Sequence, residues 1–158
     1  MAAPFWRRYR ACYDGWSYFW GVVGRSSVAR RGGAHAEKIR GTFGPDNLTG
    51  TNQLDLIYGL GNADTIVALG GNDDCYGGSG ADVTRCGPGN DRIDCGFGQD
   101  DSFGDPGNDT ISAVDGQVDQ VNCGTGTDTA YVDEKDNVDP AQTQACEHIF
   151  VAQKLVAK

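Results

Sequence analysis

The sequence has no uninterrupted run of about 18 apolar residues, the minimum for a membrane-spanning helix, so we expect no transmembrane segment. It has five prolines against 24 glycines and no glycine at every third position, which excludes a collagen-like chain. Only two histidines are present, and no G-x-S-x-G nucleophile motif. C-x-x-C spacing is also missing, which argues against a structural zinc site. With 158 residues, the chain has room for one ordinary domain.

Positive charge is scarce after residue 40. Residues 1–40 hold eight basic residues against two acids, a net charge of +6. Residues 41–158 hold five basic residues against twenty acids, a net charge of −15. Because such a segment repels nucleic acid and attracts cations, we expect no nucleic-acid partner.

Aspartate recurs with a fixed period. From Gly41 onward eight aspartates follow at a spacing of nine residues, one extra residue precedes the ninth, and the spacing of nine then returns. The ten in-phase aspartates are Asp46, Asp55, Asp64, Asp73, Asp82, Asp91, Asp100, Asp109, Asp119 and Asp128. A glycine stands two residues before seven of them, and a mostly apolar residue stands two residues after each. The unit therefore reads G-x-x-G-x-D-x-U-x, where U is a large apolar residue, and a strict period predicts a repeat architecture.

This pattern resembles the nonapeptide repeat of the RTX, or hemolysin-type, calcium-binding proteins. The resemblance covers residues 41–131, and its best copies are GGSGADVTR at 77–85, GDPGNDTIS at 104–112 and CGTGTDTAY at 123–131. It implies an all-β fold, a right-handed parallel β-roll or solenoid, in which roughly six residues of each unit form a calcium-binding turn and three form a short strand. The ten in-phase aspartates are then the predicted metal ligands.

The residues themselves favour the same fold. The glycines precede each aspartate, where a turn needs positive φ or a close approach to an ion, and the residues that follow are β-prone. Two units make a coil of eighteen residues, so alternate units stack and we expect about five coils with two inner walls. One predicted wall contains Leu48, Ile66, Thr84, Ser102 and Val121, and the other contains Ile57, Cys75, Ile93, Ile111 and Ala130.

The same stacking places alternate aspartates in two columns of carboxylates, about 4.8 Å apart along each column. At an effective dielectric constant near 20, each adjacent pair costs roughly 3 kcal/mol. Several Ca²⁺ ions between the coils would reverse this repulsion, since carboxylate and carbonyl oxygens suit Ca²⁺ better than Zn²⁺ or Mg²⁺. We therefore expect a chain that is disordered without calcium and folded with it. Ordinary use of Asp and Gly in turns explains the composition but not the period.

Six cysteines allow fifteen complete pairings, so the sequence leaves most of them open. The segment from Cys123 to Cys146-Glu147 resembles the terminal segment of small actinobacterial RTX-repeat proteins, and this resemblance implies a disulfide between Cys123 and Cys146. Cys86 and Cys95 open consecutive units and so lie on opposite sides of a regular roll, which disfavours a bond between them.

The remaining cysteines are less informative. Cys75 occupies an inward position, where it is either a small buried apolar residue or one half of a disulfide. The pairing of Cys12, Cys75, Cys86 and Cys95 stays open.

The two ends differ from the repeats. Residues 1–40 form a basic, aromatic-rich leader, which is either poorly ordered, the result of a wrongly chosen start site, or a helix that binds a membrane surface or a partner. No clear signal peptide is visible in it.

Residues 132–158 lose the glycines and are expected to cap the end of the roll. Their apolar residues are Val132, Val138, Ile149, Phe150, Val151, Leu155 and Val156.

We expect a secreted, extracellular, monomeric calcium-binding protein with no enzymatic activity. Extracellular calcium, at millimolar levels, and paired cysteines both suit that compartment. The alternative is a secretion, adhesion or interaction module of a larger RTX toxin, adhesin or hydrolase. The sequence indicates no particular protein or carbohydrate partner.

Overall fold

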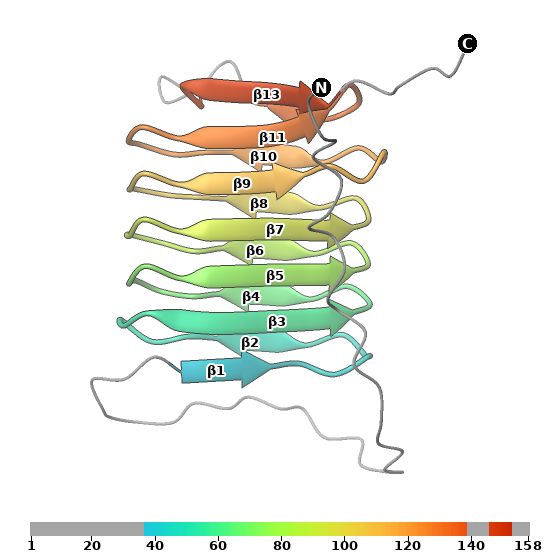
Figure 1. Ribbon diagram of the computed structural model, residues 1–158. Helices are drawn as coiled ribbons and strands as arrows, with labels where there is room; N and C mark the ends of the chain where they lie inside the picture. The colour runs from blue at the N-terminus through green and yellow to red at the C-terminus, as the bar shows by residue number, and fades with distance from the viewer. Residues whose placement is uncertain (1–36, 139–145, 153–158) are drawn as a thin grey trace, which may run out of the picture.

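A computed structural model describes residues 37–138 and 146–152, which wind into a solenoid of short β-strands (Figure 1). The strands are β1 (Glu37–Arg40), β2 (Asn47–Thr49), β3 (Asp55–Gly61), β4 (Thr65–Val67), β5 (Asp74–Ser79), β6 (Val83–Arg85), β7 (Arg92–Phe97), β8 (Asp101–Phe103), β9 (Thr110–Ala113), β10 (Gln120–Asn122), β11 (Thr129–Asp133), β12 (Asn137–Val138) and β13 (His148–Ala152). The described residues form no helix that could span a membrane.

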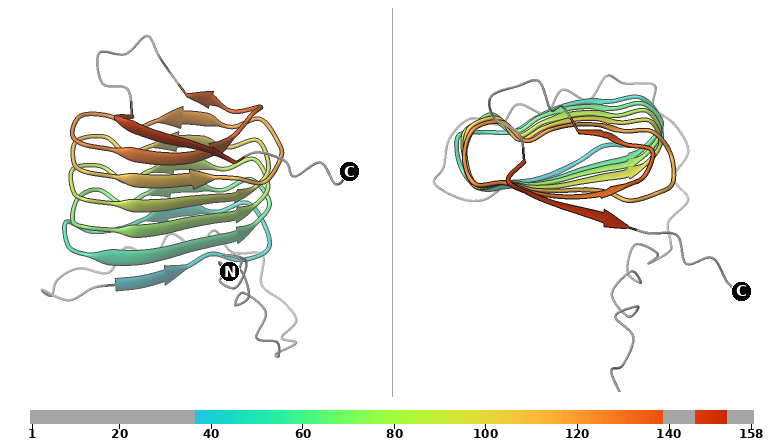
Figure 2. Two further views of the ribbon diagram at one scale, coloured as in Figure 1. Left: turned by 45° about the horizontal axis from the view of Figure 1, so that its top comes forward. Right: turned by 90° about the horizontal axis from the view of Figure 1, so that it is seen from above.

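Successive strands alternate between two parallel sheets that face each other. One sheet has the order β1-β3-β5-β7-β9-β11-β13 and the other has the order β12-β10-β8-β6-β4-β2. Viewed along the axis of the solenoid, the coils superpose as a flattened closed outline (Figure 2). The all-β parallel roll predicted from the repeats is therefore confirmed.

The register between strands follows the eighteen-residue coil. Leu48 pairs with Ile66 on one sheet, and Ile57 pairs with Cys75 on the other. All ten residues of the two predicted inner walls are buried, including the polar Thr84 and Ser102. The inner walls are therefore as predicted, because a strand places alternate side chains on opposite faces and the period of nine keeps each inward position in line.

The extra residue before Asp119 falls in the connection between β9 and β10. Stacked partners on either side of the insertion are nineteen residues apart, as Ser102 with Val121 and Ser112 with Tyr131. A turn absorbs the insertion, because a residue added within a strand would exchange its inward and outward faces.

The roll has about six coils rather than the predicted five, because strands form at both ends of the phased repeats. Strand β1 (Glu37–Arg40) lies within the range predicted as leader and pairs with β3, burying Ile39. The rest of the predicted leader lies outside the described residues, as does Cys12.

The C-terminal segment extends both sheets. Strand β12 pairs with β10 and β13 pairs with β11, with Val132 buried and Val138 packed against the core. Ile149, Phe150 and Val151 are exposed. That residues 132–158 cap the roll stays a prediction, because residues 139–145 and 153–158 lie outside the described residues. Figure 2 shows β13 leaving the outline of the other coils, and all five of its residues are exposed. Leu155 and Val156 lie outside the described residues.

After the first two units, the second residue of most units takes a positive φ. Gly78, Gly87, Gly96 and Gly124 occupy this position with φ between +87° and +111°. Leu69 occupies the same position with φ +82°, a region in which an L side chain is strained. A half-exposed leucine at this position therefore costs backbone energy that glycine would avoid.

We expect Leu69→Gly to raise the free energy of unfolding by about 0.5–1 kcal/mol, since relief of about 1–2 kcal/mol of strain exceeds the extra entropy of the unfolded glycine. Chemical denaturation at saturating calcium measures it. Leu54→Gly is the matched control, because Leu54 is similarly exposed but lies outside the positive-φ positions. A destabilised Leu69→Gly protein would show that the leucine side chain contributes more than its backbone strain costs.

Candidate metal centre

The ten in-phase aspartates all lie inside the turns, in two columns along the solenoid. Asp46 is 8% exposed and the other nine are at most 3% exposed. One column contains Asp46, Asp64, Asp82, Asp100 and Asp119, and the other contains Asp55, Asp73, Asp91, Asp109 and Asp128. The structure thus brings all ten predicted site residues into two buried rows, with adjacent members one coil apart.

In nine of the ten carboxylates, from Asp55 to Asp128, one oxygen accepts a backbone N–H from the preceding coil and holds the coils in register. The backbone N–H of Asp64 donates to Asp82 Oδ1 at 2.8 Å, and that of Asp73 donates to Asp91 Oδ1 at 2.7 Å. The same bond repeats along both columns, from each aspartate to the one in the next coil, at 2.7–2.9 Å. The aspartates therefore act as spacers between coils as well as candidate ligands.

The second carboxylate oxygen, Oδ2, accepts no hydrogen bond in most of these aspartates. Eight Oδ2 atoms are buried and have no hydrogen-bond partner among the described residues, namely those of Asp64, Asp73, Asp82, Asp91, Asp100, Asp109, Asp119 and Asp128. A buried acceptor without a partner costs about 1–3 kcal/mol, and more when it is charged. Eight such atoms in two rows are what a set of cation ligands requires.

The first two aspartates differ from the other eight. Asp46 Oδ2 accepts hydrogen bonds from the backbone N–H of Thr42 at 2.5 Å and from its hydroxyl at 2.9 Å. Asp55 Oδ2 accepts the equivalent bonds from Thr51 at 2.6 and 3.0 Å. These two carboxylates are satisfied within their own turns. The sequence carries the signal, since Gly-Thr opens both units where a second glycine is common elsewhere.

Backbone carbonyls converge on the same space as the orphaned oxygens. A Cβ added to Gly59 would contact both the carbonyl oxygen of Gly77 in the next coil and Asp64 Oδ2. The arrangement repeats at Gly77 with the carbonyl of Cys95 and Asp82, and at Gly104 with the carbonyl of Cys123 and Asp109. The first glycine of a unit therefore leaves room between a carboxylate and a carbonyl, both hard oxygen donors.

The donor set fits Ca²⁺. In the described parts of the chain, no three carboxylate, imidazole or thiol groups converge on one point. A cation between these coils would take most of its ligands from backbone carbonyls, with carboxylates completing the set. Calcium accepts six to eight such oxygens in flexible geometry, whereas zinc prefers nitrogen and sulfur ligands.

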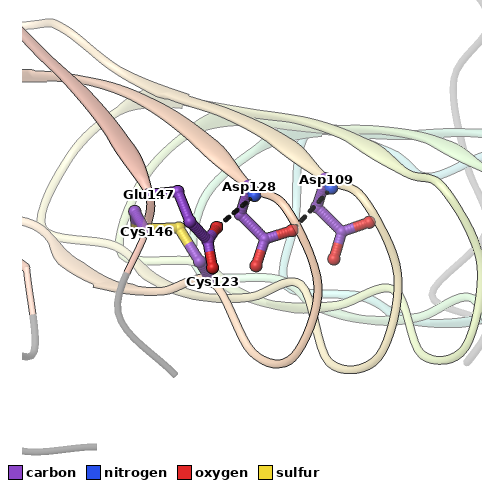
Figure 3. Close-up of a disulfide and its surroundings, with 5 residues drawn as sticks. All are labelled: Asp109, Cys123, Asp128, Cys146 and Glu147. Carbon is purple, nitrogen blue, oxygen red and sulfur yellow. Dashed lines mark hydrogen bonds between the residues drawn. A yellow bond between two sulfur atoms is a disulfide. The ribbon is translucent and has the colours of Figure 1, made fainter. Parts of the chain in front are cut away.

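Two acidic residues outside the nine-residue spacing extend the columns. Asp119 N–H donates to Asp136 Oδ1 at 3.1 Å, and Asp128 N–H donates to Glu147 Oε2 at 2.5 Å (Figure 3). Seventeen and nineteen residues separate these pairs, so the period did not identify Asp136 and Glu147 as site residues. Each takes the place of the next in-phase aspartate in its column.

A disulfide lies beside the last of these carboxylates. Cys123 and Cys146 are bonded, with their Cα atoms 5.3 Å apart (Figure 3). Cys146 directly precedes Glu147, and Cys123 supplies the carbonyl near Asp109. The bond therefore positions the final carboxylate of its column against the preceding turn.

Burial raises the pKa values of the eight column aspartates from Asp64 to Asp128, and most of these eight gain a further increase from neighbouring carboxylates. The pKa is raised to about 6 for Asp64, Asp91 and Asp119, and to about 7 for Asp73, Asp100 and Asp109. The backbone N–H bonds oppose the shift. Without a cation, the folded turns therefore favour protonated carboxyl groups.

We expect the calcium-free roll to lose stability as the pH rises from about 4 to about 7. The folded-state pKa values lie above the unfolded value of about 3.9, so the folded chain binds more protons in this window and its free energy of unfolding falls with increasing pH. Far-UV circular dichroism in chelator should show more β-signal at about pH 5 than at about pH 8. A larger signal at the higher pH would contradict the raised pKa values of the buried carboxylates.

Comparison with known proteins identifies one match. The model of the RTX calcium-binding nonapeptide repeat (4 copies) matches residues 31–66, 49–83 and 87–111. These matches cover the two columns from Asp46 to Asp109 except for the short gap at 84–86. No curated protein and no solved structure matches the chain.

Proposed function

The chain belongs to the family of proteins with RTX calcium-binding nonapeptide repeats, and we propose that it is an extracellular protein whose roll folds when its turns bind several Ca²⁺ ions. The observation that supports this most directly is the set of eight buried Oδ2 atoms without hydrogen-bond partners. They lie in rows, face backbone carbonyls, and come from the in-phase aspartates of the repeat.

The two oxygens of each aspartate have separate tasks in this proposal. Oδ1 accepts the N–H from the preceding coil and fixes the spacing, as in the bond from Asp82 to Asp100. Oδ2 and a carbonyl from the next coil form the oxygen cradle. When bound, Ca²⁺ supplies the positive charge that offsets the row of carboxylates. Folding and calcium binding are then a single equilibrium.

The proposed extracellular location rests on the calcium concentration outside the cell and on the disulfide bond. Extracellular modules bind calcium with millimolar-range dissociation constants, which suits an array that folds on export. A disulfide such as Cys123–Cys146 persists in oxidising compartments. We therefore place the folded protein outside the cell, as a monomer.

The proposal assigns no catalytic role to the chain. Eight of the ten in-phase aspartates have a use as cation ligands, and Asp46 and Asp55 are satisfied by Thr42 and Thr51. None of these carboxylates is left for acid or base catalysis.

One surface feature favours the second candidate, an interaction module of a larger RTX protein. On the outer face of the β1-to-β13 sheet, Tyr58 stacks on Tyr76 with ring centroids 4.8 Å apart, and Tyr131 stacks on the exposed Phe150 at 5.2 Å. Aromatic side chains are enriched at protein interfaces. An open reading frame that continues upstream of Met1 would favour this candidate over a stand-alone protein.

The proposal predicts that folding requires calcium at neutral pH. Far-UV circular dichroism should show little β-signal in chelator and a cooperative gain as Ca²⁺ reaches the millimolar range, while Mg²⁺ at the same concentration should give a much smaller gain. Full β-signal in chelator at pH 7 would refute it.

Two adjacent aspartates allow a sharper test. Asp100→Asn keeps an oxygen that accepts the N–H of Asp82 but replaces the orphaned oxygen with an amide donor, so we expect the calcium midpoint to rise about tenfold, equivalent to about 1.4 kcal/mol. Asp101→Asn makes the same charge change on the exposed face of β8 and should shift the midpoint less than about twofold. Equal shifts would mean that net charge alone determines the response to calcium.

A further inference from the structure

Three buried cysteines lie outside the Cys123–Cys146 disulfide: Cys75, Cys86 and Cys95. Two of them meet inside the roll. Cys86 Sγ lies 2.8 Å from Cys75 Sγ, and both residues have no exposed surface. Neither residue belongs to a carboxylate column.

The two sulfur atoms are too close for an ordinary contact. Heavy atoms that are not bonded prefer separations of about 3.5–4.0 Å, whereas a disulfide bond is about 2.05 Å long. At 2.8 Å the sulfurs lie between these values. Bond formation would require the two sulfurs to approach each other by about 0.8 Å.

The backbone on both sides keeps the sulfurs together. Cys75 is in β5, where it pairs with Ile57 on one side and Ile93 on the other. Cys86 directly follows β6, and its N–H donates to the carbonyl of Phe103 at 3.2 Å. Each cysteine is held by neighbouring coils, so their high effective concentration is built into the fold.

Cys95 does not compete for either sulfur. Its Sγ lies 3.0 Å from the hydroxyl oxygen of Ser102, which places it against a different partner. It opens the unit after that of Cys86, and it is equally buried. It therefore serves as a matched internal control.

We propose that Cys75 and Cys86 form a second disulfide, which ties β5 to the turn after β6 in the middle of the roll. The oxidant is a small disulfide such as oxidised glutathione. One cysteine thiolate attacks a glutathione sulfur and releases one glutathione thiolate, giving a mixed disulfide. The second cysteine thiolate attacks the bonded cysteine sulfur and releases the other glutathione thiolate. The two cysteines lose two protons and two electrons, and the glutathione disulfide is reduced.

The bond forms during folding, when neighbouring coils have brought the two cysteines together but their thiols still reach solvent. In the folded roll, contact with Cys75 and burial raise the pKa of the Cys86 thiol far above its usual value, and the thiolate is the attacking species. The bond therefore forms before burial of the two thiols is complete, and the folded roll then shields it from reductant.

A tryptic map of the full-length chain tests the proposal. The chain is refolded with oxidised glutathione and Ca²⁺, alkylated in denaturant without reductant, and digested. Because Arg40, Arg85 and Arg92 flank the two cysteines, Cys75 falls in peptide 41–85 and Cys86 in peptide 86–92. We expect these two peptides as one linked species that reductant separates.

Cys95 is in peptide 93–135, so a link from either peptide to 93–135, or to the peptide that contains Cys12, would overturn the proposal. Recovery of 41–85 and 86–92 as separate alkylated peptides would also overturn it. Cys95→Ser should leave the link intact, whereas Cys86→Ser should leave Cys75 alkylated. Far-UV circular dichroism of the same refolded sample reports calcium-driven folding, so a failure of the disulfide proposal in a folded roll is distinguishable from a failure of calcium binding.

Discussion

Repulsion between stacked carboxylates is the constraint on which the rest of this structure depends. The roll places ten in-phase aspartates inside its turns, one coil apart along each column, where burial raises the pKa of most of them. Hydrophobic burial alone offers little to offset this, because Thr84, Ser102 and Ala130 occupy three of the ten wall positions, and further buried residues such as Ala68 and Ala113 are small. The fold therefore depends on a cation more than on a large apolar core.

The carboxylates also provide the regular geometry that a cation array needs. One oxygen of each aspartate from Asp55 onward accepts a backbone N–H from the preceding coil, so the hydrogen bonds that align the coils also align the free oxygens. Glycine at the first position of a unit keeps the carbonyl of the next coil close to that oxygen, as at Gly59 and Gly77. Structural spacing and candidate metal binding thus use the same side chains.

Disulfide bonds supplement the aspartate columns, above all where the nine-residue repeat ends. Beyond Asp128 the repeat ends, and the last strand, β13, presents exposed side chains. The Cys123–Cys146 bond and Glu147 together attach that strand to the last turn. In the middle of the roll the inner wall carries cysteine in place of a large aliphatic residue, and the proposed bond between Cys75 and Cys86 would compensate for lost packing.

The period of nine was sufficient to predict the parallel roll, both inner walls and the two aspartate columns, because a regular coil places every residue relative to those one turn away. Departures from the period required the tertiary structure. The threonine hydroxyls that satisfy Asp46 and Asp55, the addition of Asp136 and Glu147 to the columns, and the contact of Cys75 with Cys86 all depend on side-chain positions in neighbouring coils. Sequence spacing specifies which residues share a column, whereas hydrogen bonds and contacts between coils decide which oxygens and sulfurs remain unpaired.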